Sequence, residues 1–227
     1  MWGEGTLMAM TEVRKKRIIH IPVAARVARK PPKVWGPGWG PDGPTPEQAD
    51  TEQLWIDLRL RGRRAEIVDG RIIVSPWAKR RHSRIVDRLY LQLHDVRVAN
   101  GWECHQNWAV HIPPLRGDKR IPDLLVTTAT CPEFDENQGY GYGALLAVEV
   151  TSEGSRHEDL SIKPKEYARA GVPLLLVLDD LAAPRTAVLF QDPGEHGYQK
   201  RISPLPGEAL LLPDPFGVKI DLDAIFS

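Results

Sequence analysis

The segment 145–180, LLAVEVTSEGSRHEDLSIKPKEYARAGVPLLLVLDD, decides the fold because it joins two apolar runs through a polar stretch. Each apolar run is typical of a buried strand, and the stretch at 156–170 is typical of a helix that ends at Gly171. A strand, a helix and a strand in this order predict a parallel βαβ unit. Glu149 interrupts the first run, and an ionised acid in a buried strand needs a partner or a metal ion.

Further patterns extend this unit in both directions along the chain. The sequence predicts a helical segment at 45–62, a β-hairpin at 64–76, an amphipathic helix at 78–101, a strand at 121–128 and short hairpins near 186–191, 198–202 and 208–212. The first hairpin turns at Asp69-Gly70, because glycine accepts the positive φ of a tight turn. We therefore expect residues 47–227 to form one α/β domain with a mixed central β-sheet flanked by helices.

Residues 1–46 have a different composition and are predicted to form a basic, Pro/Gly-rich N-terminal tail. They contain eight Lys and Arg against three Asp and Glu, a net charge of about +5. Proline and glycine at this density disfavour a helix or an inner strand. A basic arm suits a polyanionic partner, but a solvated extension with little effect on stability explains the same composition.

The composition excludes several classes of protein. With 227 residues, of which 42% are hydrophobic and 26% charged, the chain is typical of a globular protein with one substantial core. No apolar run reaches the roughly 18 residues of a membrane span, and no secretory signal is evident. Cys104 and Cys131 lack the spacing of a disulfide framework or a zinc site, so a reducing cytoplasmic setting is expected.

Two acids lie on strands that otherwise look buried, Asp123 in IPDLLV and Glu149 in LAVEVTS. Adjacent strands can bring such acids together, and two carboxylates with waters make an adequate Mg²⁺ site. Alternatively, each acid lies at a strand end and faces solvent. Lys163, in the following helix, either reaches back over this pair to stabilise negative charge or forms an ordinary i,i+4 pair with Asp159.

The motifs EIVDGRIIVSP, RRHSRIV, PDLLV and VEVTSEGSRHEDLSIKPKEYARAGVPLLLVLD, in this order, resemble the Uma-type restriction endonuclease family of the PD-(D/E)XK nuclease superfamily. The resemblance covers roughly residues 48–190 and implies a restriction-endonuclease-like core with a metal-dependent phosphodiesterase site. Asp123 and Glu149 would then hold the metal, assisted by the backbone carbonyl of Val150. The lysine usual two positions after the second acid is replaced by Thr151, and Lys163 becomes the candidate.

The same resemblance implies roles for residues outside the acid pair. Glu66 matches an early glutamate that completes or orients the metal site. His82 matches an early helical histidine, although a histidine there can equally cap or pack near a helix start. Tyr167 is expected to be a packing or hydrogen-bonding neighbour, and Asp159 a neighbour of the substrate or of the metal ligands.

The leading hypothesis is therefore an endonuclease that hydrolyses phosphodiester bonds of DNA through water activated by Mg²⁺ or Mn²⁺. The alternative is a catalytically inactive nuclease-fold protein that binds nucleic acid or a protein partner. A homodimer would suit double-strand cutting, and no membrane association is expected. No element is typical of sequence-specific recognition, so the choice between DNA and RNA stays open.

Overall fold

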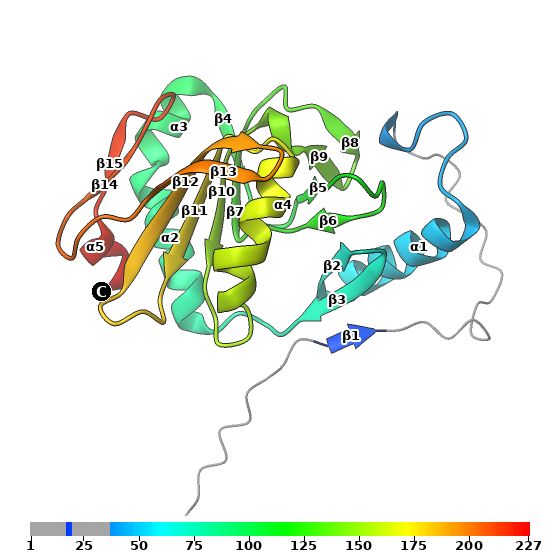
Figure 1. The fold of residues 1–227 in the computed structure, drawn as a ribbon, viewed down its shortest axis with the longest axis horizontal. Coiled ribbons are helices and arrows are strands. Elements are labelled where there is room, and N and C mark those ends of the chain that lie inside the picture. The colour runs from blue at the N-terminus through cyan, green and yellow to red at the C-terminus, as the bar shows by residue number, and fades with distance from the viewer. Residues whose placement is uncertain (1–16, 20–36) are drawn as a thin grey trace, which may run out of the picture.

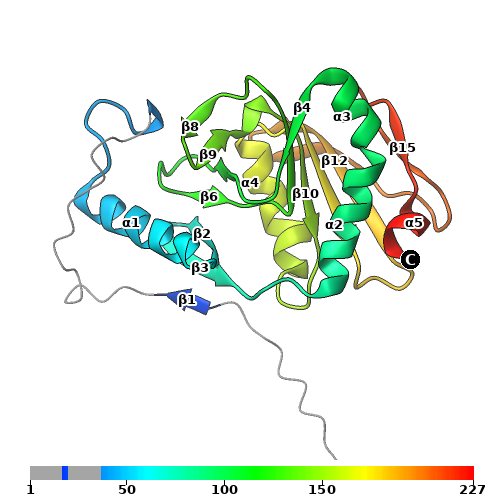
Figure 2. The same ribbon diagram turned by 180° about the vertical axis from the view of Figure 1, so that it is seen from behind.

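The computed structural model describes residues 37–227 and the backbone of residues 17–19 (Figures 1 and 2). The helices are α1 (Pro46–Leu60), α2 (Arg80–Gln92), α3 (His94–Asn100), α4 (Lys163–Arg169) and α5 (Leu222–Phe226), with shorter turns η2 (Pro37–Trp39), η3 (Gly141–Gly143) and η4 (Glu158–Ile162). The strands are β1 (Arg17–Ile19), β2 (Arg64–Val68), β3 (Arg71–Ser75), β4 (Trp102–His105), β5 (Ala109–His111), β6 (Lys119–Arg120), β7 (Leu124–Thr128), β8 (Glu133–Asp135), β9 (Gln138–Tyr140), β10 (Ala144–Val150), β11 (Leu174–Asp179), β12 (Thr186–Gly194), β13 (Gly197–Ile202), β14 (Leu210–Leu212) and β15 (Val218–Ile220).

The central sheet has the strand order β13-β12-β11-β10-β7-β4. Strands β10 and β11 are parallel, and the turn η4 with helix α4 forms the crossover between them. The other pairs in this sheet are antiparallel. The predicted βαβ unit and the mixed sheet are therefore confirmed.

Helices cover both faces of the central sheet. Figure 1 shows α4 in front of the sheet, and Figure 2, from behind, shows α2 across the opposite face. Side chains alternate between the faces along each strand: Val148 packs with Leu89 of α2, whereas Ala147 packs with Tyr167 of α4. Both faces are buried, which explains why β10 and β11 are apolar throughout except at Glu149 and at the end of β11.

A second sheet, in the order β1-β3-β2-β6-β5-β9-β8, contains the predicted Asp69-Gly70 hairpin. Both turn residues have positive φ, 50° at Asp69 and 70° at Gly70. The carboxylate of Asp118 accepts hydrogen bonds from both turn N–H groups, at 2.7 and 2.9 Å. Because Asp118 directly precedes β6, this contact fixes the hairpin beside the strand that leads to Asp123.

Helix α1 is attached to the second sheet by a buried lysine. The ammonium of Lys119 contacts both carboxylate oxygens of Glu52 at 2.6 Å and lies 4.0 Å from the centre of the Trp55 ring. All three side chains are almost completely buried. A buried lysine requires this compensation, because an isolated charge in the core is strongly unfavourable.

The amphipathic segment predicted as one helix at 78–101 forms two helices, α2 and α3, which meet at Leu93. This residue is completely buried, and its N–H still bonds to the carbonyl of Leu89. The side-chain amide of Gln92, the last residue of α2, forms two hydrogen bonds with the backbone of Asp221. The C-terminal segment that begins α5 therefore contacts the chain where α2 ends. The hydrophobic periodicity of residues 78–101 does not predict this contact, because the partner is distant in the sequence. None of the helices in the described residues is long and apolar enough to cross a membrane.

Part of the segment predicted as a tail packs against the domain. Trp39, in η2, is completely buried, and its ring makes an edge contact with Phe134 at a centroid distance of 5.5 Å. The backbone of Arg17–Ile19 pairs with β3. Residues 1–16 and 20–36 lie outside the described residues, so the tail prediction stays untested there. The burial of Trp39 shows that this part of the segment 1–46 packs on the domain, and its contribution to stability stays a prediction.

We expect Trp39→Ala to lower the free energy of unfolding by about 3–5 kcal/mol, because it removes a fully buried aromatic side chain. Urea denaturation measures the change. Trp77→Ala is the matched control, since the Trp77 side chain is 68% exposed and its loss should cost less than about 0.5 kcal/mol. Equal effects of the two changes would contradict the assignment of Trp39 to the core.

Candidate active site

The register of β7 and β10 places Asp123 and Glu149 opposite each other. Ala147 pairs with Leu125 in this antiparallel ladder, and two further residues along each strand lead to positions 149 and 123. Both acids therefore leave the sheet on the face that also carries Ala147 and Leu125, the face covered by α4. The N–H of Asp123 bonds to the carbonyl of Val148 at 2.9 Å, which fixes the end of β7.

Each carboxylate oxygen of Asp123 has a hydrogen-bond or ion-pair partner. One oxygen accepts the N–H of Val150 at 2.7 Å, and the other contacts the guanidinium of Arg64 and Nε2 of His82, the latter at 3.1 Å. Burial alone would raise the pKa of Asp123, but Arg64 and His82 outweigh burial and hold this pKa well below its usual range. Asp123 is therefore ionised at neutral pH.

Glu149 is bound by two residues of α4. Its carboxylate contacts the ammonium of Lys163 at 2.8 Å and accepts a hydrogen bond from the Tyr167 hydroxyl at 2.7 Å. Burial raises the pKa of Glu149 against the opposing effect of Lys163, and together with the nearby charge of Asp123 it brings this pKa to about 7. Glu149 thus takes up a proton near neutral pH when only these groups surround it.

Lys163 lies between two buried acids. Its ammonium is 2.8 Å from Glu149 and 2.9 Å from Oδ1 of Asp159, and all three side chains are at most 5% exposed. Burial lowers the pKa of Lys163, but the two carboxylates outweigh burial and raise this pKa above its ordinary value. The lysine is therefore a permanent cation at the centre of the site, and it satisfies both sequence-based interpretations at once.

Asp159 has unused hydrogen-bonding capacity. Its side chain is 1% exposed, yet within the described part of the chain neither carboxylate oxygen has a hydrogen bond of good geometry. The ammonium of Lys163 is close to Oδ1 but outside that geometry. A buried carboxylate oxygen without a donor is costly, which makes Asp159 an acceptor available to a bound molecule.

Glu66 lines the same cavity but is held by the strand β6. Its carboxylate accepts a hydrogen bond from the N–H of Ile121 at 3.0 Å and from Arg120 at 3.1 Å. The buried Arg120 also donates to Glu166 of α4, at 2.7 and 3.0 Å. The structure thus places Glu66 in the lining of the cavity that contains the acid pair, and Arg120 joins β2, β6 and α4 in one charged network.

Thr151, two positions after Glu149, has a structural contact. Its hydroxyl donates to Asp179 at 3.0 Å, and Arg156 forms an ion pair with the same carboxylate at 2.8 Å. The cation near Glu149 is supplied by Lys163, from the helix that crosses over to β11. Thr151 therefore binds the end of β11, and the charge at Glu149 comes from α4.

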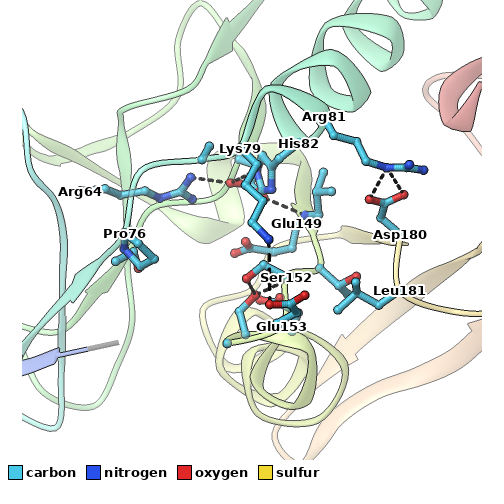
Figure 3. Close-up of a pocket in the computed structure, with 18 of the residues that line it drawn as sticks. Arg64, Pro76, Lys79, Arg81, His82, Glu149, Ser152, Glu153, Asp180 and Leu181 are labelled. Atoms are coloured by element: carbon cyan, nitrogen blue, oxygen red, sulfur yellow. Dashed lines mark hydrogen bonds and ion pairs between the residues drawn. The ribbon is translucent and has the colours of Figure 1, made fainter. Parts of the chain in front are cut away.

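These residues surround a cavity of about 600 Å³ (Figure 3). Its deep lining includes Arg64, Glu66, Asp123, Glu149, Asp159 and Lys163, and its exposed lining includes Trp77, Lys79, Arg81, Glu153 and Leu181. Figure 3 shows Arg64, His82 and Glu149 directed toward the same space, with Arg81 paired to Asp180 at one side. The arrangement combines oxygen donors with fixed cations in one recess.

Sequence reasoning missed Arg64 and Arg120. Arg64 begins the hairpin that contains Glu66, and Arg120 stands three positions before Asp123. The closeness of each arginine to an acid in the sequence was the only available signal. Arginines in hairpins and loops are commonly exposed, so this signal did not single out Arg64 and Arg120. Only the packing of β2 against β6 shows that both guanidinium groups turn inward.

The mixed sheet with helices on both faces defines an α/β fold, and charged side chains gather at the end of two of its central strands. A solved structure described as a putative nuclease belonging to DUF820, from Anabaena variabilis, has the same fold with a TM-score of 0.56. It is 14% identical, and the match covers 71% of this chain and 89% of that one. No curated protein matches this chain in sequence.

Residues 51–224 match the Uma2 family, whose description is "Putative restriction endonuclease". The chain belongs to this family. The resemblance found in the sequence motifs and the expected restriction-endonuclease-like core are therefore confirmed. The roles of the individual site residues stay predictions.

We expect Lys163→Met to lower the free energy of unfolding by about 3–5 kcal/mol at pH 8, because it leaves Glu149 and Asp159 buried without a cation. Without the opposing charge of Lys163 the pKa of Glu149 will rise further in the folded state, so the folded state will bind more protons than the unfolded state. Acidification will therefore reduce the loss, and urea denaturation at pH 8 and pH 5.5 measures the difference.

Lys200→Met is the matched control for this experiment. Lys200 pairs with Asp192 at 2.7 Å, but both side chains are about half exposed or more. An exposed pair contributes little, so this change should cost less than about 1 kcal/mol at either pH. A Lys163 variant as stable as the Lys200 variant would contradict a structural dependence on the buried lysine.

Proposed function

We propose that this cavity hydrolyses phosphodiester bonds of DNA with the aid of a divalent cation, Mg²⁺ or Mn²⁺. The observation that carries the proposal is the convergence of Asp123, Glu149 and Lys163 at one recess, with two acids on adjacent strands and a cation above them. Membership of a family described as restriction endonucleases supports the reaction class. The proposed setting is the cytoplasm, and a homodimer would suit cleavage of both strands.

The residues present fit a hard divalent cation. Asp123 and Glu149 contribute carboxylate oxygens, Val150 lines the same cavity and has a backbone carbonyl, and Asp159 has oxygens without a donor. Within the described residues no cluster of three or more His, Cys, Asp or Glu side chains is arranged to hold a metal ion. Two carboxylates are nevertheless sufficient for Mg²⁺, which prefers oxygen ligands and keeps several of its waters.

When bound, such a cation neutralises charge on the phosphate and makes a bound water more acidic. Asp123, already ionised, would hold the cation, and Glu149 would do so after losing its proton. Lys163 would stabilise the negative charge that develops on the phosphate oxygens. Tyr167 would keep Glu149 oriented through its hydroxyl, and Asp159 would accept a hydrogen bond from a water in the recess.

One observation favours the alternative function, binding of nucleic acid without cleavage. Arg64 contacts a carboxylate oxygen of Asp123, one of the residues that would hold the metal, and it also donates to the carbonyl of Ile121. An arginine that stayed there would neutralise the site without any metal. Arg64→Ala separates the two functions: this change should strengthen Mn²⁺ binding if a metal replaces the guanidinium, and leave it undetectable if the site is purely a binding site.

We expect Glu149→Gln to abolish Mg²⁺- or Mn²⁺-dependent nicking of plasmid DNA while leaving the fold intact. Glutamine keeps the shape of the side chain and its contact with Tyr167, but it lacks the charge that a hard cation requires. Ca²⁺ should bind the wild-type site and support little turnover, because its looser coordination positions the attacking water poorly. Gel assays measure nicking, and calorimetry measures metal binding.

Glu153→Gln is the matched control, because Glu153 lines the same cavity but its side chain is 53% exposed. It should nick DNA at the wild-type rate. The enzyme hypothesis fails if the wild-type protein cleaves no single-stranded, double-stranded or branched DNA with Mg²⁺, Mn²⁺ or Co²⁺, and if calorimetry also detects no metal binding that depends on Glu149.

The affinity for Mn²⁺ should increase with pH up to about pH 7. Burial and the neighbouring acids raise the pKa of Glu149 to about 7 in the metal-free protein, and a cation must displace that proton. Below pH 7 the apparent affinity should therefore fall by up to about tenfold per pH unit, and above pH 8 it should be constant. Calorimetric titrations at pH 6, 7 and 8 measure this dependence, which Glu149→Gln should abolish.

A further inference from the structure

We propose that the mouth of the cavity binds a single-stranded or locally unpaired stretch of nucleic acid, with one base stacked on the indole ring of Trp77. This inference rests on the proposed function, because it names the form of substrate that reaches Asp123 and Glu149. Such binding requires an aromatic ring with a face open to solvent, basic side chains that contact the phosphates, and a path from the surface to the acid pair.

Trp77 provides the open aromatic face. It lies in the short connection between β3 and α2, it lines the cavity, and it is 68% exposed. A methyl group added at Gly62 would lie 3.6 Å from Cη2 and Cζ2 of the ring, so one edge of the indole rests on the turn after α1. The ring is thus supported at one edge and otherwise available. An exposed indole face at the entrance of a polar cavity can stack a nucleic-acid base.

Cations surround this ring on two segments of the chain. Segment 70–86 contains five basic residues and no acid, and helix α2 has no acid in its first turn. Lys79 and Arg80 follow Trp77 after a single alanine and are exposed. Arg61 and Arg63 flank the glycine on which the ring rests. The contact of Lys79 with Glu153 spans 3.9 Å between two exposed side chains, so a phosphate can replace it at little cost.

The charge pattern favours nucleic acid over a protein partner at this mouth. Phosphates repeat along a strand at a spacing that a row of basic side chains can follow, and aromatic rings between such cations stack bases without sequence preference. The chain as a whole has no net charge. The local excess of Lys and Arg around Trp77 is therefore a property of this surface and not of the composition.

Stacking on Trp77 selects an unpaired base. In an intact duplex both faces of each internal base are covered by its neighbours, so an indole ring at the cavity mouth can stack only on a base that is single-stranded, terminal or turned out. The acids are recessed as well, with Asp123 6% and Glu149 2% exposed. A strand with rotational freedom can bring its phosphate into that recess while its base stays on Trp77.

The test compares Trp77→Ala with the wild-type chain in EDTA, where no cleavage occurs. Fluorescence anisotropy measures binding of a 12-nucleotide single strand and of a blunt hairpin duplex of the same sequence at one salt concentration. We expect Trp77→Ala to weaken single-strand binding about tenfold and duplex binding less than threefold. A 2-aminopurine base in the single strand should be quenched by the wild-type protein and by Trp77→Phe, but less by Trp77→Ala.

Tyr142→Ala is the matched control, because Tyr142 is 62% exposed, stacks on Tyr140 and does not belong to the cavity lining. It should bind both DNAs as the wild type does. Replacing Lys79 and Arg80 by alanine should weaken both DNAs equally and reduce the salt dependence of binding by about two ions.

The inference is overturned if Trp77→Ala weakens single-strand and duplex binding equally, or if neither DNA binds at low salt. Its failure is distinguishable from failure of the proposed function. Nicking by a protein whose single-strand binding does not depend on Trp77 leaves the nuclease proposal intact and removes this inference. Selective loss of single-strand binding in a protein that never nicks DNA supports the inference and favours the binding function.

Discussion

The contact of Lys163 with Glu149 and Asp159 is the interaction on which the site depends. Three charged side chains are buried together, and removal of the lysine would leave both acids uncompensated in a medium of low polarity. The lysine comes from the crossover helix and Glu149 from the strand before it. The βαβ unit is therefore held together by the same charges that give the cavity its chemistry.

Two buried or partly buried arginines also join separate elements of the domain through ion pairs. Arg120 joins Glu66 of one sheet to Glu166 of the crossover helix, and Arg64 joins the hairpin to Asp123. Each pair connects segments that are far apart in the sequence. A domain with so many inward ionic contacts costs more to desolvate than an apolar core, but it fixes a polar recess in one geometry, which an active site needs.

Two residues that follow Glu149 carry out different structural tasks. Thr151 binds Asp179, so it stabilises the start of the crossover. Lys163 supplies the cation near Glu149 from the crossover helix. Spacing along the sequence does not show this division, because the contact of Lys163 with Glu149 depends on how the helix packs on β10.

The sequence by itself determined the βαβ unit, the Asp69-Gly70 hairpin and the two acids on apolar strands, because periodicity and turn chemistry are local properties. It also named Lys163 as the candidate cation near Glu149. The tertiary structure alone decided that Arg64 and Arg120 turn inward, that Trp39 is buried and that the helix at 78–101 breaks at Leu93. These outcomes depend on contacts between residues 54 to 129 positions apart in the sequence, and local sequence patterns do not encode such contacts.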